Sequence, residues 1–304
     1  MKVNSHIKKS KLDIGIDIFI YCYLAYVIFI TLYPFLNVLA VSLNDSVDTV
    51  RGASFIIPRK FTWNNYIEIF KYPNLVHAFG VSIARTLIGT VAGVVCSCML
   101  AFTLSRQDYV FRKFISMLFV LTMYISGGLI PSFMLMRSLK LIGTFWVYII
   151  PALVGPFYVI LIRSFIDGIP YSLQECASIE GANDLTIFFR IIVPLCLPVI
   201  ATVALYIAVG QWNSWFDTYL YNKAKPEYST LQYELMKILQ SSTASSAQSM
   251  AKLNENAVRT AVNTVSPQSI KMAITIVVTL PILLVYPFIQ RYFVSGLTLG
   301  AVKS

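Results

Sequence analysis

Residues 175–194 read ECASIEGANDLTIFFRIIVP, a charged and glycine-containing segment between two long apolar runs. Just before and within it, Pro170 and Ser172, followed three residues later by Glu175, predict the start of a helix through a capping box. Gly181 predicts the end of that helix, because glycine readily adopts the left-handed conformation that closes many helices. We therefore expect a short helix, a turn, and a second helix that continues into the next apolar run.

The predicted first helix carries a small apolar face, because Leu173, Cys176 and Ala177 lie at helical spacing. A face of this kind on a polar connecting segment has to be buried against something. The segment therefore predicts a contact surface.

The composition of the whole chain indicates a membrane protein. Of its 304 residues, 57% are hydrophobic and 12% are charged, whereas about 25% of the residues in soluble domains are charged. The net charge of +10 comes from basic residues scattered singly along the chain. They form no stripe interleaved with exposed aromatic residues, so we do not expect nucleic acid as a partner.

Stretches of about 20 residues without ionisable groups are long enough to cross a bilayer as helices. The chain has six of them, at residues 18–41, 86–105, 114–136, 141–162, 191–216 and 272–290. No small-residue cleavage site follows the first stretch, so we expect a retained helix rather than a signal peptide. The predicted fold class is an all-α membrane protein with six transmembrane helices.

The distribution of basic residues gives only a weak indication of orientation. Lysine and arginine counts are nearly equal on the two predicted sides of the membrane. Lys8, Lys9 and Lys11 lie just before the first span and favour cytoplasmic termini.

Motifs for catalysis are missing from the sequence, so we expect no catalytic residues. It contains no phosphate-binding loop, no H-E-x-x-H pattern and no paired carboxylates in the spans, and its histidines are His6 and His77. Cys96 and Cys98 point to different faces of a helix and have no histidine or carboxylate nearby, so we expect no metal site. A solute pump built on this chain would need an energy source in another protein.

Small side chains recur every four residues in the second span, at Gly89, Gly93, Ser97 and Ala101. This spacing lets another helix approach closely. We therefore expect a packing surface there.

The segment 175–194 resembles the EAA loop of permease subunits of ABC importers. The pattern of that loop is E-A-A, three residues, G, nine residues, I, one residue, L-P. The matching residues are Glu175, Cys176, Ala177, Gly181, Ile191, Val193 and Pro194. Cys176 and Val193 depart from the pattern by mild changes in size and polarity.

The resemblance to carbohydrate-uptake permeases covers nearly the whole chain. It is carried by IIPRKFTWNNYIEIF (56–70), AFTLSRQDYVFRKFI (101–115) and QRYFVSGLTLGAVKS (290–304). Residues 124–146 (YISGGLIPSFMLMRSLKLIGTFW) and 206–221 (YIAVGQWNSWFDTYLY) further resemble the subgroup that imports complex oligosaccharides.

The resemblance implies a six-helix, MetI-like type I ABC importer permease fold in a bacterial cytoplasmic membrane. It implies a second, homologous permease subunit, two copies of a cytoplasmic ATPase and an extracytoplasmic sugar-binding protein as partners. ATP and Mg²⁺ would bind the ATPase, and this chain would hold no cofactor. The EAA helix would dock in a cleft of the ATPase, which places its loop in the cytoplasm.

The same resemblance implies a domain organisation. Residues 1–17 would be a cytoplasmic tail with the start of the first helix, 18–295 the permease domain, and 296–304 a cytoplasmic tail. Within the domain, 167–194 would be the coupling loop and 221–270 a long outer loop. The residues expected to couple to the ATPase are Ser172, Glu175, Cys176, Ala177, Gly181, Ala182 and Asp184.

Polar and aromatic residues interrupt the fifth span at Gln211, Trp212, Asn213 and Trp215. Amide groups and aromatic faces suit sugars, which present hydroxyl groups and apolar C–H faces. We expect these residues, with Tyr124 in the third span, on the substrate path. An interfacial aromatic belt is the other interpretation that the pattern allows.

The outer loop and the solute leave alternatives open. Residues 221–270 contact the binding protein or the partner permease in one hypothesis, and form a plain solvated connector in the other. An importer of amino acids or phosphate, and a secondary transporter, are the alternative functions. The scarcity of ionisable groups in the spans disfavours a secondary transporter.

Overall fold

The computed structural model describes residues 11–52, 56–71, 74–240 and 267–301. The described residues contain helices and no strand, which confirms the predicted all-α class. One isolated antiparallel bridge joins Asn44 and Phe61. The chain forms two compact units, Met1–Lys71 with Ser242–Val277, and Tyr72–Ser241 with Val278–Ser304. We call these the first and the second unit.

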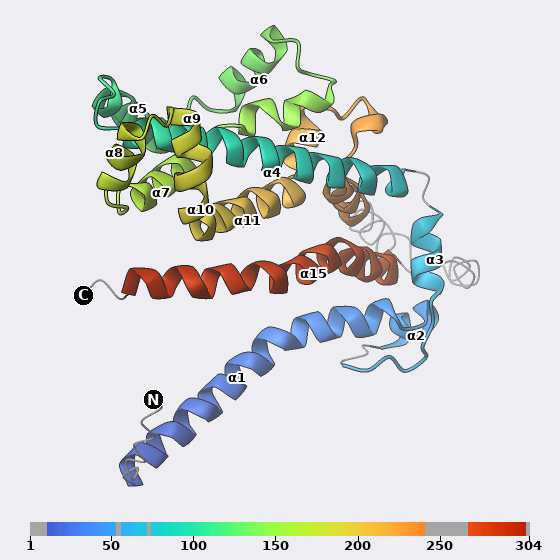
Figure 1. The fold of residues 1–304 in the computed structure, drawn as a ribbon. Helices are drawn as coiled ribbons and strands as arrows, with labels where there is room; N and C mark the ends of the chain where they lie inside the picture. The colour runs from blue at the N-terminus through green and yellow to red at the C-terminus, as the bar shows by residue number, and fades with distance from the viewer. Residues whose placement is uncertain (1–10, 53–55, 72–73, 241–266, 302–304) are drawn as a thin grey trace. The chain divides into compact units, whose positions relative to one another are not determined.

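The first unit contains α1 (Lys11–Ser42), α2 (Ser46–Arg51), α3 (Asn64–Phe70) and the start of α15 (Pro267–Ala301) (Figure 1). A buried amide group organises the end of α1. The side chain of Asn65 donates to the carbonyl oxygens of Ser42 at 2.8 Å and Asn44 at 2.9 Å. These bonds satisfy carbonyl groups that the helix end leaves without intrahelical partners.

The second unit holds most of the helices. They are α4 (Leu75–Ser105), α5 (Arg112–Tyr124), α6 (Leu129–Ser138), α7 (Pro156–Ile166), α8 (Ser172–Ile179), α9 (Asp184–Ile187), α10 (Val193–Leu195), α11 (Leu197–Asn213) and α12 (Phe216–Tyr221). Single turns of 3₁₀-helix lie at Phe145–Tyr148, Ile150–Ala152 and Pro226–Tyr228, and a π-helical turn lies at Phe188–Ile192. Residues 231–240 are also helical.

The helices supply up to six membrane spans, at the places that the apolar runs predict. Among the described residues, three helices are unbroken and apolar enough to cross, at Leu12–Ser42, Leu75–Ser105 and Gln268–Val285. The other three predicted spans are pairs of helices bent by 120°, 43° and 82° at short breaks. The prediction of six transmembrane helices therefore holds when each bent pair is one span.

The bends occur where glycine and proline interrupt the helical hydrogen bonds. The sharpest bend, between α5 and α6, lies at Gly127–Gly128, where Gly128 has a φ of +86°. The bend of 82° before α11 lies between Pro194 and Pro198, whose nitrogens cannot donate to the preceding turn. By contrast, α1 continues through Pro34, so a proline alone does not locate a break.

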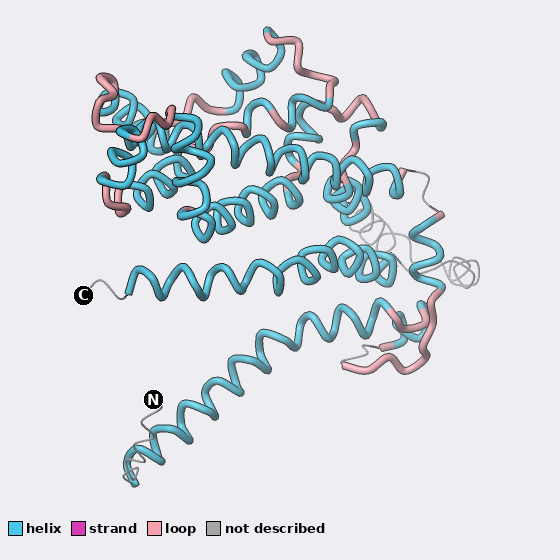
Figure 2. Tube along the Cα trace, in the orientation of Figure 1, coloured by secondary structure: helices cyan, strands magenta, loops and turns pink. Residues whose placement is uncertain are grey.

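Helix α4 is the centre of the second unit and packs along α11 and α7 (Figures 1 and 2). The predicted small-residue surface is buried, and a Cβ atom added at Gly93 would lie 3.3 Å from Cδ1 of Ile207 on α11. A larger side chain at this position would require Ile207 to shift by a few tenths of an ångström. The prediction of a packing surface is therefore confirmed, with α11 as the helix that uses it.

Candidate functional site

The segment that resembles the EAA loop forms a helix, a turn and a second helix, as predicted. At the end of α8, the N–H of Gly181 donates to the carbonyl of Ser178 at 3.0 Å, and that of Ala182 donates to Ala177 at 2.9 Å. Gly181 has a φ of +85°. This pair of bonds around a left-handed glycine is a Schellman motif, which confirms the predicted helix end.

The predicted capping box at the start of α8 is wrong. Tyr171 precedes the helix with helical backbone angles, and no side chain caps it. Ser172 is the first residue of α8, so its hydroxyl group does not occupy the N-cap position. The N–H groups of Leu173 and Gln174 bond to the carbonyls of Pro170 at 3.2 Å and Tyr171 at 2.9 Å. Because the preceding turn already satisfies these donors, a side-chain cap is not needed.

The second helix of the loop has a side-chain cap. Oδ1 of Asn183 accepts from the backbone N–H of Thr186 at 2.8 Å and from its hydroxyl at 2.7 Å. Asp184 is the first residue of α9, where a carboxylate is stabilised by the helix dipole. The chain then continues into α11, as predicted, after the break at Cys196.

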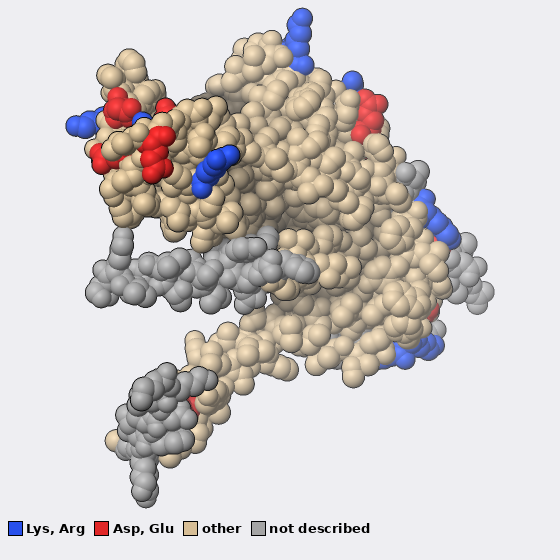
Figure 3. Space-filling view, in the orientation of Figure 1, with Lys and Arg blue, Asp and Glu red and all other residues tan. Residues whose placement is uncertain are grey.

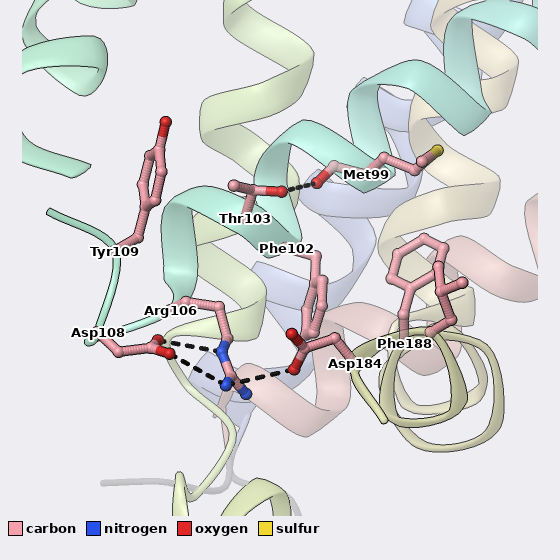
Figure 4. Close-up of a pocket in the computed structure, with 9 residues that line it drawn as sticks. Met99, Phe102, Thr103, Arg106, Asp108, Tyr109, Asp184 and Phe188 are labelled. Atoms are coloured by element: carbon pink, nitrogen blue, oxygen red, sulfur yellow. Dashed lines mark hydrogen bonds and ion pairs between the residues drawn. The ribbon is translucent and has the colours of Figure 1, made fainter. Parts of the chain in front are cut away.

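Arg106, directly after α4, holds both parts of this loop (Figure 4). Its guanidinium bonds the carboxylate of Asp108 at 3.2 and 3.3 Å, and Nη2 lies 3.3 Å from Oδ1 of Asp184. Nη1 is 3.5 Å from Oε1 of Gln174, which is buried on α8. One side chain therefore links the end of α4 to α8 and α9.

The interaction between Arg106 and Asp108 shifts the pKa values of both groups. The hydrogen bond from Arg106 lowers the pKa of the Asp108 carboxyl group below its ordinary value. Burial would lower the pKa of Arg106, but the hydrogen bond to Asp108 and the charge of Asp184 outweigh it and raise that pKa. Both shifts favour the ionised forms of Arg106 and Asp108.

A second ion-pair cluster lies where the loop begins. The carboxylate of Asp167 is 3.5 Å from Nη2 of Arg112 on α5 and 3.4 Å from Nε of Arg163 on α7. Arg163 also donates to the hydroxyl group of Ser116 on α5. The loop is thus anchored to α5 and α7 at its start, and to the end of α4 through the Arg106 cluster.

A cavity of about 330 Å³ lies beside the Arg106 cluster (Figure 4). Its lining combines the charged group with apolar and aromatic side chains. The lining residues are Met99, Phe102, Thr103, Arg106, Asp108, Tyr109, Asp184, Leu185 and Phe188. Asp184, Leu185 and Phe188 belong to the loop 167–194, so the cavity borders this loop.

The outer surface of α8 is free for a partner. Ala177 packs against the hydrophobic core, as does Ala182 after the turn. Leu173, Cys176 and Glu175 are exposed. Acidic side chains gather over α8 and α9 (Figure 3), and within the described part of the chain no cation pairs with the Glu175 carboxylate. The predicted apolar face is therefore divided between the core and the surface.

The residues predicted on the substrate path fall into two groups. Gln211 and Trp212 are buried, with 6% and 8% of their surface exposed. The indole N–H of Trp212 donates to the carbonyl oxygen of Val278 at 3.0 Å, and its ring meets Phe79 edge-on at 6.0 Å. Both side chains are thus engaged inside the second unit.

The other three residues are accessible. Asn213 is exposed, and Tyr124 is 84% exposed beside the bend between α5 and α6. Trp215 is half-buried, with its ring 5.7 Å from that of Phe216. A role of these residues on the substrate path stays a prediction.

The buried arginine of α4 was not predicted from the sequence. This helix begins at Leu75, eleven residues before the predicted start of the span, and Arg85 within it is 3% exposed. The predicted span was a stretch without charges, so it began directly after Arg85. The sequence did contain a possible partner for Arg85, because polar residues, among them Asp217, follow α11.

Comparisons with known proteins agree with this architecture. The family described as "Binding-protein-dependent transport system inner membrane component" matches residues 9–299. The chain is 37% identical to the polygalacturonan/rhamnogalacturonan transport system permease protein YtcP of Bacillus subtilis, over 94% of this chain and 98% of that protein. It is 28% identical to the arabinooligosaccharides transport system permease protein AraQ of Halalkalibacterium halodurans, over 92% and 94% of the two chains.

A solved structure is also similar to this one along nearly its whole length. A chain of a bacterial ABC transporter involved in the import of the acidic polysaccharide alginate superposes with a TM-score of 0.82. The match covers 94% of this chain and 99% of that chain, with 25% sequence identity. This chain therefore belongs to the family of binding-protein-dependent transport system inner membrane components, and it has the fold of an ABC importer permease.

Proposed function

We propose that this chain is a permease subunit of an ATP-driven oligosaccharide importer. It would form half of the translocation path, and a second, homologous permease would form the other half. ATP and Mg²⁺ would bind two copies of a cytoplasmic ATPase, and a binding protein outside the membrane would deliver the sugar. The support for oligosaccharides is the similarity over more than nine-tenths of the chain to permeases named for such substrates.

The observation that carries the coupling role is the surface of α8. Glu175, Leu173 and Cys176 are exposed on a short helix whose orientation is set by the Arg106 cluster. We infer that this surface docks in the ATPase, with Ala177, Gly181, Ala182 and Asp184 shaping the helix and its turn. With this role, residues 167–194 and both termini would lie in the cytoplasm.

The contacts on the outer side are also part of the proposal. Asn213, Trp215 and Tyr124 are accessible to a solute and offer an amide, an indole and a phenol for sugar recognition. The loop 221–270 would contact the binding protein or the partner permease. Residues 231–240 of this loop are helical, and residues 241–266 lie outside the described residues.

The test is uptake by the complete transporter in proteoliposomes. This chain would be reconstituted with the second permease, the ATPase and the binding protein encoded by neighbouring genes. We expect ATP-dependent accumulation of a labelled oligogalacturonide or arabino-oligosaccharide, and no ATP hydrolysis by this chain alone. ATP-driven uptake of only amino acids or phosphate would assign another importer class, and uptake without the ATPase would indicate a secondary transporter.

A further inference from the structure

One guanidinium group in the second unit bonds three residues on both sides of a helix break. Nε of Arg85 on α4 donates to Oε1 of Gln211, in the last turn of α11, at 2.7 Å. Its Nη1 lies 3.3 Å from the carbonyl oxygen of Ser214, in the connection to α12. The same Nη1 is 3.1 Å from Oδ1 of Asp217, in the first turn of α12, and Nη2 bonds the other carboxylate oxygen.

The amide group of Gln211 is held from its second side by Tyr148. Its Nε2 donates to the carbonyl oxygen of Tyr148 at 3.3 Å, and the Arg85 guanidinium lies 4.5 Å from the centre of the tyrosine ring. Arg85 and Gln211 are both buried. The cluster therefore has little freedom to rearrange.

Helix α4 leaves room for this amide at Gly89, one turn after Arg85. A Cβ atom at Gly89 would lie 2.9 Å from Nε2 and 3.0 Å from Cδ of Gln211. A methyl group there would displace the end of the Gln211 side chain. The packing of α4 on α11 is thus matched to the position of this amide.

Burial of an ion pair is not in itself a source of stability, because desolvation offsets the attraction of the charges. Arginine does, however, fix the directions of its partners, since its guanidinium presents planar donors in a rigid fork. Here the partners are the end of α11, the connection and the start of α12. Asn213 and Trp215, which are accessible, lie in that same stretch.

We propose that Arg85 is a positioning residue of the solute pathway. Through Gln211, Ser214 and Asp217 it sets the direction of the junction between α11 and α12, and so the placement of Asn213 and Trp215. This inference rests on the proposed function, because it concerns how the chain meets the sugar. It assigns to a buried polar cluster a role in affinity for the solute.

The test compares sugar affinity with maximal rate in the reconstituted complete transporter. The variants are Asp217→Asn, which weakens the pair at nearly constant size, and Gly89→Ala, which displaces Gln211 without changing charge. A labelled oligogalacturonide mixture and labelled arabino-oligosaccharides serve as probes. We expect the half-saturating concentration to rise by at least about fivefold for Asp217→Asn, the low end for coupling between two sites, with a smaller loss of maximal rate.

The matched control for Gly89→Ala is Gly80→Ala on the same helix, where an added Cβ meets no atom within 4 Å. We expect a raised half-saturating concentration for Gly89→Ala and the wild-type value for Gly80→Ala. Wild-type values in both Asp217→Asn and Gly89→Ala would overturn the positioning role, even if their thermal stability fell. If wild-type transporter took up neither sugar, the proposed function would fail and this inference with it.

Discussion

Arg106, the residue that follows α4, pairs with Asp184, the first residue of α9, with 3.3 Å between Nη2 and Oδ1. The same guanidinium bonds Asp108 in the connection to α5 and contacts Gln174 on α8. The candidate coupling loop is therefore tied to the helix that packs along α11 and α7. A partner that displaced the loop would act directly on the centre of the second unit.

Arg106→Ala should uncouple the loop from α4. The side chain of Arg106 is 17% exposed, whereas its partners Asp108 and Asp184 are 67% and 70% exposed, so solvent screens each pair. We expect sugar-stimulated ATP hydrolysis to fall, because Arg106 bonds Asp108, Asp184 and Gln174 together and its removal breaks the links between α4 and the loop. Hydrogen exchange across residues 172–187 should become faster.

The matched control for Arg106→Ala is Lys71→Ala. Lys71 pairs with Glu68 at 2.6 Å, but 63% of its side chain is exposed, so the pair contributes little. We expect wild-type hydrolysis from this variant. Equal behaviour of the two variants would show that the Arg106 cluster does not hold the loop in a functional orientation.

Glu175→Gln should reduce uptake without changing α8. Because Glu175 lies in the first turn and takes no part in a cap, its replacement removes a charge and leaves the helix intact. Lysine at this position adds an unfavourable interaction with the helix dipole of about 0.3–1 kcal/mol and should be more harmful. Uptake assays measure transport, and circular dichroism measures helix content. Near-normal uptake by the Gln variant would rule out charge pairing with the ATPase.

Gly181→Val should misorient α8. No atom lies within 4 Å of a Cβ at this position, so the cost is backbone strain at a φ of +85°, about 1–2 kcal/mol. We expect impaired uptake and faster hydrogen exchange at the end of α8. Gly181→Asn should retain more activity, because asparagine tolerates the left-handed region. Gly80→Ala is the control, because Gly80 does not have a positive φ. Equal impairment of Gly181→Val and Gly80→Ala would contradict a special role for the left-handed turn at Gly181.

Trp212→Leu and Trp215→Leu should have different consequences. Loss of the Trp212 indole removes its hydrogen bond to the buried Val278 carbonyl oxygen, a bond that typically contributes about 0.5–1.5 kcal/mol, so thermal stability should fall. Trp215→Leu should leave stability nearly unchanged and reduce sugar uptake. Measurements of thermal unfolding and of sugar uptake distinguish the two variants. If only Trp212→Leu reduced uptake, Trp215 would not lie on the substrate path.

The positions of the spans were predictable because lipid demands long apolar helices. The locations of their breaks were not, since Pro34 lies inside the continuous α1 while the helix bends between Pro194 and Pro198. Whether a helix continues through proline depends on neighbours that can satisfy the freed carbonyl groups. Those neighbours come from distant parts of the sequence.

The candidate site shows the same limit. Gly181 was predictable, because a left-handed turn strongly favours glycine, which has no Cβ atom. The capping role of Ser172 was wrong, since backbone carbonyls of the preceding turn satisfied the donors first. Arg85 was missed because its partners Gln211 and Asp217 lie 126 and 132 residues away.

The central claim is that the exposed face of α8 meets the ATPase, and Cys176 on that face allows a direct measurement. A cysteine-specific photo-crosslinker attached to Cys176 in membranes that contain the assembled transporter should join this chain to the ATPase subunit. Cys176→Ser should abolish that product. If Cys176 reacts with the reagent but forms no product with the ATPase, or if a membrane-impermeant maleimide labels it only from outside the cell, the account is contradicted.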